Sequence, residues 1–320
     1  MKLGFLTAMY SNMPLQKVLE LTRPLGLEAV ELGTGNFPGD PHAPLQELLK
    51  SKPKRDELLA MLKGEGMILS ALSCHGNCLH PDAKYAQKCQ QVQSDTIKLA
   101  EMMGVKTVID FSGCPGSDEG AKRPSWITCP WPPDYLEALE WQWEKKVIPY
   151  WTKQAKFAKD HGVQVAFELH PGFVVYNTET MLKLRKACGN NLGANLDPSH
   201  LFWQGMDPID VVRALGKAIF HVHAKDSLVY EQNSRINGVL DTKHYGDEIN
   251  RSWIFRTCGY GHSIEWWKDF VSTLRMVGYD YVLSIEHEDS LMSNNEGLRK
   301  AVECLRQAII SEKVTAITWA

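Results

Sequence analysis

The sequence predicts an α/β fold in which eight parallel strands alternate with helices and close into a (β/α)8 barrel. Strand-like and helix-like segments alternate from one end of the chain to the other. This alternation implies parallel strands joined by right-handed helical crossovers. In addition, polar side chains gather at the C-terminal ends of the later strand-like segments, where such barrels carry their reacting groups. An open doubly wound sheet would also satisfy the alternation, but eight units over roughly 310 residues fit the closed barrel better.

Each short apolar segment is followed by a segment with helical periodicity. The strand-like segments cover residues 2–9, 29–33, 68–74, 107–112, 165–170, 193–200, 219–226 and 282–288. The helix-like segments cover residues 14–25, 54–65, 84–103, 135–161, 178–187, 208–215, 264–277 and 295–310. Glycine follows several of these helices, as expected where a helix stops in the left-handed conformation, at Gly26, Gly66, Gly104, Gly162 and Gly278. No repeat and no low-complexity linker interrupts the pattern. We therefore expect one domain over residues 1–320, with the barrel in 1–311 and a C-terminal tail in 312–320.

Two long loops interrupt this rhythm, after the fourth and the seventh strands. They cover residues 113–134 and 227–262 and are rich in Trp, Pro, Arg and Tyr. Long loops in compact domains are usually lids or binding loops. Aromatic faces and guanidinium groups suit the apolar faces and hydroxyls of a sugar, so we expect Trp131 and Arg256 to contact substrate. The alternative, that these side chains only pin the loops to the barrel rim, stays open.

The overall composition is that of an ordinary globular protein of 320 residues, with 44% hydrophobic and 23% charged residues. A net charge of −3 offers no electrostatic reason to expect a nucleic-acid or anionic-membrane partner. The first apolar segment ends too early for a signal-peptide core, and no run approaches the roughly 18 apolar residues of a membrane span. The 8 cysteines are too sparse for a disulfide scaffold. We expect a cytoplasmic protein.

Four of the strand-like segments end in a side chain that can bind a divalent metal. These side chains are Glu168, Asp197, His223 and Glu286. Because the C-terminal ends of parallel barrel strands face one mouth, we expect the four to converge on a single ion. Taken singly, each has an ordinary structural alternative, such as a turn aspartate or a satisfied buried histidine. Their joint placement predicts a metalloenzyme.

Three carboxylates and one imidazole make a fairly hard site, for which we expect Mn²⁺, with Mg²⁺, Co²⁺ and Zn²⁺ as alternatives. Four protein ligands leave positions for two adjacent substrate oxygens, such as a ketone beside a hydroxyl. Chelation makes the neighbouring C–H acidic and stabilises the enediolate that forms. Glu168 and Glu286 are then the candidate acid and base. Epimerisation, aldose–ketose isomerisation and elimination all remain open, depending on where the proton goes.

Several other polar residues are expected near this mouth. His75, His200, Lys225 and Asp226 follow or lie close to strand ends and are candidate substrate contacts. A structural zinc site in the Cys74–Cys78 segment is an alternative for His75, but no matching second pair of cysteines occurs. His221 shares a strand face with His223 by the period of two, so we expect it in a supporting position.

At these residues the chain resembles the sugar phosphate isomerase/epimerase superfamily of xylose-isomerase-like TIM barrels. The resemblance covers nearly the whole chain and rests on Phe-Glu-Leu-His-Pro at 167–171, Asp-Pro-Ser-His at 197–200, His-Val-His-Ala-Lys-Asp at 221–226 and Ser-Ile-Glu-His-Glu at 284–288. It implies a Mn²⁺ or similar ion on the four ligands, Glu168 and Glu286 as the acid and base of a ketose 3-epimerase, and His200 as a substrate contact.

The loop at residues 227–262 departs from simple ketose epimerases, in which it is shorter. It is more similar to members that handle 3-keto-glycosides or keto-inositols. Some of these, the large subunits of C-glycoside deglycosidases, eliminate an aglycone and work with a small partner subunit. The sequence thus predicts a sugar isomerase or epimerase of carbohydrate metabolism, with a lyase acting by elimination or dehydration as the alternative. A sugar-binding barrel without turnover is a third hypothesis, and a homo-oligomer paired through outer helices is left open.

Overall fold

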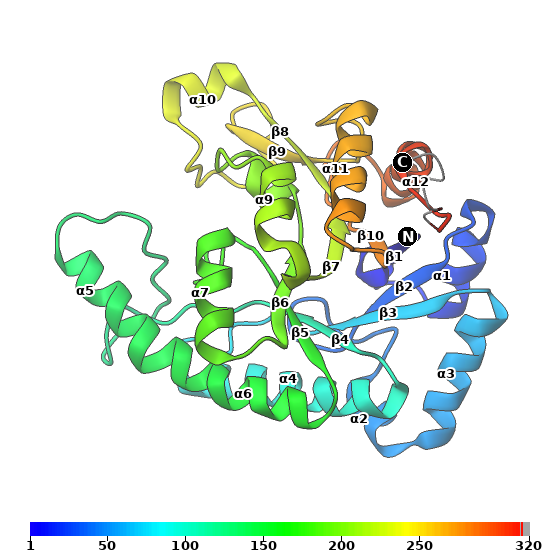
Figure 1. Cartoon of the computed structure of the whole chain (residues 1–320), viewed down its shortest axis with the longest axis horizontal. Helices are drawn as coiled ribbons and strands as arrows, with labels where there is room; N and C mark the ends of the chain where they lie inside the picture. Colours follow the sequence, from blue (N-terminus) through cyan, green and yellow to red (C-terminus); the bar gives the residue numbers. More distant parts are fainter. Residues whose placement is uncertain (314, 316–320) are drawn as a thin grey trace.

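Eight parallel strands close into a barrel in the computed structural model, which describes residues 1–313 and residue 315 (Figure 1). The strands are β1 (Lys2–Leu6), β2 (Ala29–Gly33), β3 (Ile68–Ser73), β4 (Thr107–Asp110), β5 (Gln164–Glu168), β6 (Leu192–Leu196), β7 (Ile219–Ala224) and β10 (Val282–Ile285). They follow one another around the barrel in chain order, and β10 closes it against β1. The predicted (β/α)8 barrel is confirmed. Most of the expected C-terminal tail, residue 314 and residues 316–320, lies outside the described residues.

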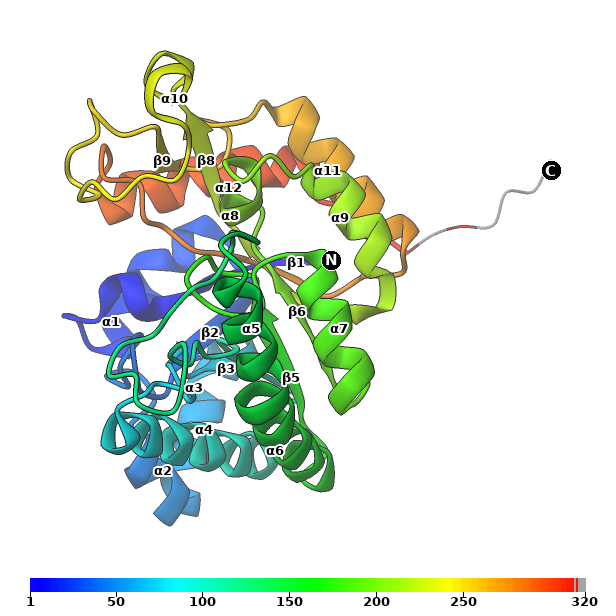
Figure 2. The ribbon, with the colours of Figure 1, turned by 90° about the vertical axis from the view of Figure 1, so that its left-hand side faces the viewer.

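Helices surround the barrel on its outer side (Figures 1 and 2). The α-helices are α1 (Leu15–Thr22), α2 (Leu45–Lys50), α3 (Lys52–Gly64), α4 (Ala83–Met103), α5 (Asp134–Trp141), α6 (Ile148–Asp160), α7 (Thr178–Cys188), α8 (Ser199–Phe202), α9 (Pro208–Leu215), α10 (Glu231–Asn237), α11 (Ile264–Met276) and α12 (Asn294–Ala308). Short helical turns are η1 (Thr7–Tyr10), η2 (Arg23–Leu25), η4 (Gly216–Ala218) and the π-helical η3 (Gln142–Val147).

The helix α12 shows why these segments pack on the barrel. Its buried side chains include Leu298, Ala301, Val302 and Leu305. They recur at the three- and four-residue spacing that forms one apolar stripe on a helix. The sequence did not predict α2, a helix of only six residues, because so short a segment shows little periodicity.

Both predicted insertions are present, and the second contains its own secondary structure. After β7 the chain forms β8 (Asp226–Val229) and β9 (Trp253–Arg256), which pair antiparallel, with α10 between them. This hairpin stands above the barrel at the top of Figure 1, and α5 extends to the left. The first insertion lies between β4 and α5.

Two irregularities interrupt the regular pairing of the barrel strands. Between β2 and β3 the register shifts, so that Val30 pairs with Leu69 but Glu31 pairs with Ala71. A similar shift occurs between β6 and β7 at Asn195. Shifts of this kind re-aim side chains and are common next to active sites. No helix in the described part of the chain is long and apolar enough to cross a membrane.

Candidate active site

The structure brings the four predicted ligands together at one mouth of the barrel. Glu168 ends β5, Asp197 follows β6, His223 lies in β7, and Glu286 follows β10. One donor atom from each residue lies within 4.8 Å of the other three. The parallel strands produce this convergence because all of their C-terminal ends point the same way.

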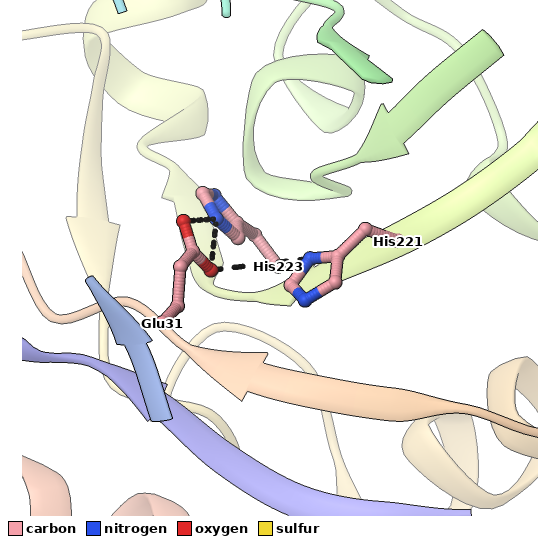
Figure 3. Close-up of side chains that lie close together, drawn as sticks. All are labelled: Glu31, His221 and His223. Atoms are coloured by element: carbon pink, nitrogen blue, oxygen red, sulfur yellow. Dashed lines mark hydrogen bonds and ion pairs between the residues drawn. The ribbon is translucent and has the colours of Figure 1, made fainter. Parts of the chain in front are cut away.

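The unsatisfied atoms of this cluster fit a cation. Nε2 of His223 donates to the Glu31 carboxylate, 3.1 Å from each oxygen (Figure 3). The other ring nitrogen, Nδ1, lies 3.1 Å from Glu286 Oε2 and 3.3 Å from Glu168 Oε2, and in the neutral ring it would carry a lone pair. His223 Nδ1 and Asp197 Oδ2 are buried and form no hydrogen bond with the described residues, although Lys225 Nζ lies 3.3 Å from Asp197 Oδ2. Buried polar atoms are rarely left unpaired, and a divalent ion would satisfy both.

The electrostatics of the cluster also favour a bound positive charge. Burial lowers the pKa of His223, but the carboxylates of Glu31 and Glu286 outweigh it and raise that pKa well above the usual value. Burial opposes ionisation of Glu168, yet hydrogen bonds from His200 and His223 hold its pKa well below the usual value. The same carboxylates that would hold a proton on His223 would hold a metal ion in its place.

Glu31 is the functional residue that sequence reasoning missed. Its buried carboxylate also accepts hydrogen bonds from Ser284 Oγ at 2.8 Å and from Ser73 Oγ, and it lies 3.9 Å from His221 Nδ1 (Figure 3). Burial by itself would raise the pKa of Glu31, but the neighbouring His223 outweighs burial and lowers that pKa to about 2. A carboxylate that orients a metal-binding histidine is a common second-sphere partner. The available signal was a single Glu inside the otherwise apolar strand at residues 29–33.

Two of the predicted substrate contacts, His75 and His200, bind the Glu168 carboxylate. His75 Nε2 lies 3.0 Å from Glu168 Oε2, and His200 Nε2 lies 2.9 Å from Glu168 Oε1. Both rings are buried and reach the carboxylate from different strands' ends. They fix the position of Glu168 and keep it ionised.

Lys225 lies inside the site, whereas Asp226 points away from it. The Lys225 ammonium contacts Glu286 at 2.9 Å, Glu288 at 2.8 Å and Asp197 at 3.3 Å. Asp226 accepts from the backbone N–H of His262 at 2.9 Å and pairs with its ring at 2.7 Å. Lys225 lies between β7 and β8, and Asp226, the first residue of β8, anchors the second insertion through His262.

The two predicted loop contacts lie outside the metal-ligand cluster. Arg256 donates to Asp289 Oδ2 at 3.1 Å and packs its guanidinium over Tyr260. Trp131 is 73% exposed. Cys74 and Cys78 lie beside the buried Asp110, at 3.7 and 3.9 Å from its Oδ2.

A cavity of about 240 Å³ opens above the ligand cluster. Its lining includes Glu168, Glu286, Lys225, His75, His170 and Phe111. A carbonyl compound in this cavity would meet two carboxylates and an ammonium group, with an apolar ring on one wall.

Comparison with known proteins agrees with this architecture. Residues 19–308 match the protein family described as the xylose isomerase-like TIM barrel. The chain belongs to this family. It is 42% identical over 312 residues to the protein YfiH of Bacillus subtilis, which covers 97% of this chain and 99% of YfiH. It is also 33% identical over 92 residues to an inosose dehydratase of Clostridium perfringens, covering 28% of this chain and 30% of that enzyme.

The same fold occurs in solved structures of low sequence identity. A D-tagatose 3-epimerase-like protein superposes with a TM-score of 0.65 at 20% identity, covering 96% of this chain and 97% of that one. This likeness shows the fold, and the match to the inosose dehydratase covers about a third of either chain.

Proposed function

We propose that this chain is a divalent-metal-dependent sugar isomerase or epimerase that moves a proton on the carbon beside a keto group. The observation that carries the proposal is the cluster of Glu168, Asp197, His223 and Glu286, whose donor atoms lie within 4.8 Å of one another. The two glutamates come from β5 and from the end of β10, which β6 and β7 separate in the barrel. They therefore approach the cavity from different sides.

The four clustered residues would hold the ion, for which Mn²⁺ is the expected metal and Mg²⁺, Co²⁺ and Zn²⁺ are alternatives. When bound, the ion would supply Lewis acidity that makes the C–H next to the carbonyl acidic. Everything else in the mechanism depends on the chain's own side chains. His75 and His200 hold the Glu168 carboxylate in place, and Lys225 holds that of Glu286.

Both glutamates are ionised before substrate enters, as a base must be. Burial raises the pKa of Glu286, but the neighbouring Lys225 ammonium lowers it well below the usual value. One carboxylate removes the proton from the substrate carbon and leaves an enediolate. The other, once protonated, returns a proton to the opposite face, which gives an epimer. Proton transfer between neighbouring carbons gives the aldose–ketose isomer instead.

Elimination from a 3-keto-glycoside or keto-inositol is the second candidate, and two observations favour it. The local likeness to inosose dehydratase points to loss of water from a cyclic ketone. Lys225 is buried, which lowers its pKa, but Glu286 and Glu288 outweigh burial and keep it protonated with a pKa well above the usual value. Its ammonium group lines the cavity and can donate a hydrogen bond to a departing hydroxyl or glycosidic oxygen, while the carboxylic acid formed by the base can supply the proton that this oxygen needs.

Solvent exchange tests the shared first step and product mass separates the two candidates. The Mn²⁺-loaded protein is incubated in heavy water with ketoses, 3-keto-glucosides and keto-inositols. We expect deuterium beside the carbonyl; an epimer keeps the carbon skeleton and hydration state, whereas elimination releases water or an aglycone. Glu286→Gln should reduce exchange by roughly 10²–10⁴-fold because a general base is lost.

Glu28→Gln is the matched control, because Glu28 is exposed at the opposite end of the barrel and pairs with Lys2 at 2.7 Å. It should exchange at the wild-type rate. Full exchange by Glu286→Gln would eliminate the proposed role of Glu286.

A further inference from the structure

A second cavity adjoins the cavity above the ligand cluster, between the two insertion loops. It has a volume of about 390 Å³. Its walls include Trp126 from the first insertion, Trp203 after α8, and Tyr245 and Trp253 from the second insertion. His170 lines both cavities. We call the second cavity the aromatic chamber.

The aromatic walls are held rigidly by contacts behind them. Trp203 and Trp253 stack with their planes 3° apart and their centroids 4.7 Å apart. Trp253 Nε1 donates to Val239 O at 3.1 Å. The Arg251 guanidinium packs against Tyr245 and Trp253 at 4.5 and 4.6 Å from their ring centroids. Such rigid aromatic faces suit a ring-shaped ligand because little side-chain freedom is lost on binding.

The aromatic chamber lies next to the proposed catalytic groups. His200 lines it and also bonds to Glu168 Oε1 at 2.9 Å. A ring nitrogen of His170 lies within 4.8 Å of both a Glu168 oxygen and a His200 nitrogen. A substrate that passes His170 would thus place one part beside Glu168 and another part against the aromatic walls of the chamber.

The chemistry of the walls selects a neutral occupant. The charged side chain among the described lining residues is Asp241, whose carboxylate accepts from Ser252 N at 2.6 Å and Lys243 N at 2.9 Å. No lysine or arginine lines the chamber in the described part of the chain, so a phosphate or carboxylate would go unpaired. The indole N–H groups of Trp126 and Trp203 are buried without an acceptor among the described residues.

We propose that the aromatic chamber is a second subsite that binds a neutral six-membered ring joined to the reacting keto ring. The inference rests on the proposed function and extends it, because it makes the natural substrate a two-ring compound rather than a free monosaccharide. The size of the cavities agrees, since 240 Å³ alone falls below the range of about 300–1,000 Å³ common for ligand sites, and the chamber adds 390 Å³. The attached ring is either an aromatic group or a second sugar.

Filling the chamber from its exposed edge tests this inference. Thr242 lines the chamber and is exposed, so Thr242→Phe adds a ring there without entering the core. Ile249→Phe is the matched control, because Ile249 lies in the same loop, is 87% exposed and is not part of the lining. Activity is compared on 3-keto-glucose, phenyl 3-keto-glucoside and 3-keto-cellobiose.

For Thr242→Phe we expect kcat/KM on a two-ring substrate to fall at least roughly tenfold, with 3-keto-glucose unchanged. Ile249→Phe should match wild type on all three. An equal loss on one-ring and two-ring substrates, or no loss on any, would overturn the inference. Loss confined to the phenyl glucoside or to the cellobiose derivative identifies the attached ring.

A binding measurement separates this inference from the proposed function. Phenyl glucoside and cellobiose, which carry no keto group, should quench tryptophan fluorescence of the wild type and of Ile249→Phe. Their affinity for Thr242→Phe should be at least roughly tenfold weaker. If no compound exchanges solvent deuterium but this difference in binding holds, the proposed reaction fails and the subsite stands. If neither probe binds the wild type at millimolar concentration, the subsite is ruled out even where exchange is observed.

Discussion

The carboxylate of Glu31 lies 3.1 Å from Nε2 of His223 through each of its oxygens, although 192 positions separate the two residues in the chain. This contact assigns the ring proton to Nε2 and leaves Nδ1 facing Glu168 and Glu286. The imidazole is therefore oriented for a cation before any cation binds.

Removing the charge of Glu31 should weaken metal binding while the fold is retained. In Glu31→Gln the side chain can still accept a hydrogen bond from His223, but the negative charge behind the ring is lost. We expect Mn²⁺ affinity to fall by roughly 10–100-fold, as is typical for second-sphere carboxylates. Calorimetric titration of the metal-free protein measures it, with Glu28→Gln as the control three positions earlier. Equal affinity in Glu31→Gln and wild type would show that Glu31 does not tune the site.

Metal binding should stabilise the folded protein. The clustered ligands come from four separate strands, so an ion binds the folded chain far better than the unfolded one. With the metal at about 100 times its Kd, the free energy of unfolding should rise by about 2.7 kcal/mol. Thermal or urea unfolding with Mn²⁺ and with a chelator measures the difference. Asp197→Asn should lose most of this metal dependence, and an unchanged increment in that variant would contradict the assignment of Asp197 as a ligand.

Asp226 should matter more for stability than for substrate binding. Its buried carboxylate also accepts from the backbone N–H groups of Gly259 and Gly261, each at 3.2 Å. Gly261 permits this approach, since a Cβ there would lie 2.5 Å from Asp226 Oδ1. We expect Asp226→Asn to lower the free energy of unfolding by about 2 kcal/mol, because charged hydrogen bonds are lost. Urea denaturation and steady-state kinetics are compared. Unchanged stability with a raised KM would restore the role of substrate contact.

Asp110 predicts a pH dependence of stability. Burial raises its pKa from 3.8 to about 6, although hydrogen bonds from Gln93 and the backbone oppose this. As pH rises, the Asp110 carboxyl loses its proton at a lower pH in the unfolded chain than in the folded protein. The free energy of unfolding that Asp110 contributes therefore falls between about pH 4 and pH 6, by about 3 kcal/mol in total. The Asp110→Asn variant has no titrating group at this position, so it should not show this fall in the free energy of unfolding.

The difference in unfolding free energy between wild type and Asp110→Asn isolates the effect from the other carboxylates. It should shift in favour of the variant between pH 4 and pH 7, as measured by urea denaturation. Asp269→Asn, on the exposed side of α11, is the control. A difference that stays constant across this range would refute the prediction.

The sequence alone was enough to predict the barrel and the four residues that cluster at its mouth. Each strand is short and apolar, and a helix follows it with a period that the chain shows locally. Glu168, Asp197, His223 and Glu286 sit at strand ends, and parallel strands bring such ends to one mouth whatever the details of packing. The local sequence pattern was therefore sufficient to predict that these four residues cluster.

Only the tertiary structure decided the surroundings of that cluster. Glu31 meets His223 because the closed barrel turns β2 and β7, which are not neighbours in the sheet, toward a common interior. The pattern within either strand does not specify that contact. Lys225 and Asp226 are neighbours in the sequence but make different contacts. Lys225 pairs with Glu286, whereas Asp226 accepts hydrogen bonds from the backbone of Gly261 and His262. The aromatic chamber forms where two loops more than 100 positions apart face each other, as Trp126 and Tyr245 do. Contacts between distant segments depend on how the whole barrel places its loops, so no local signal in the sequence could specify them.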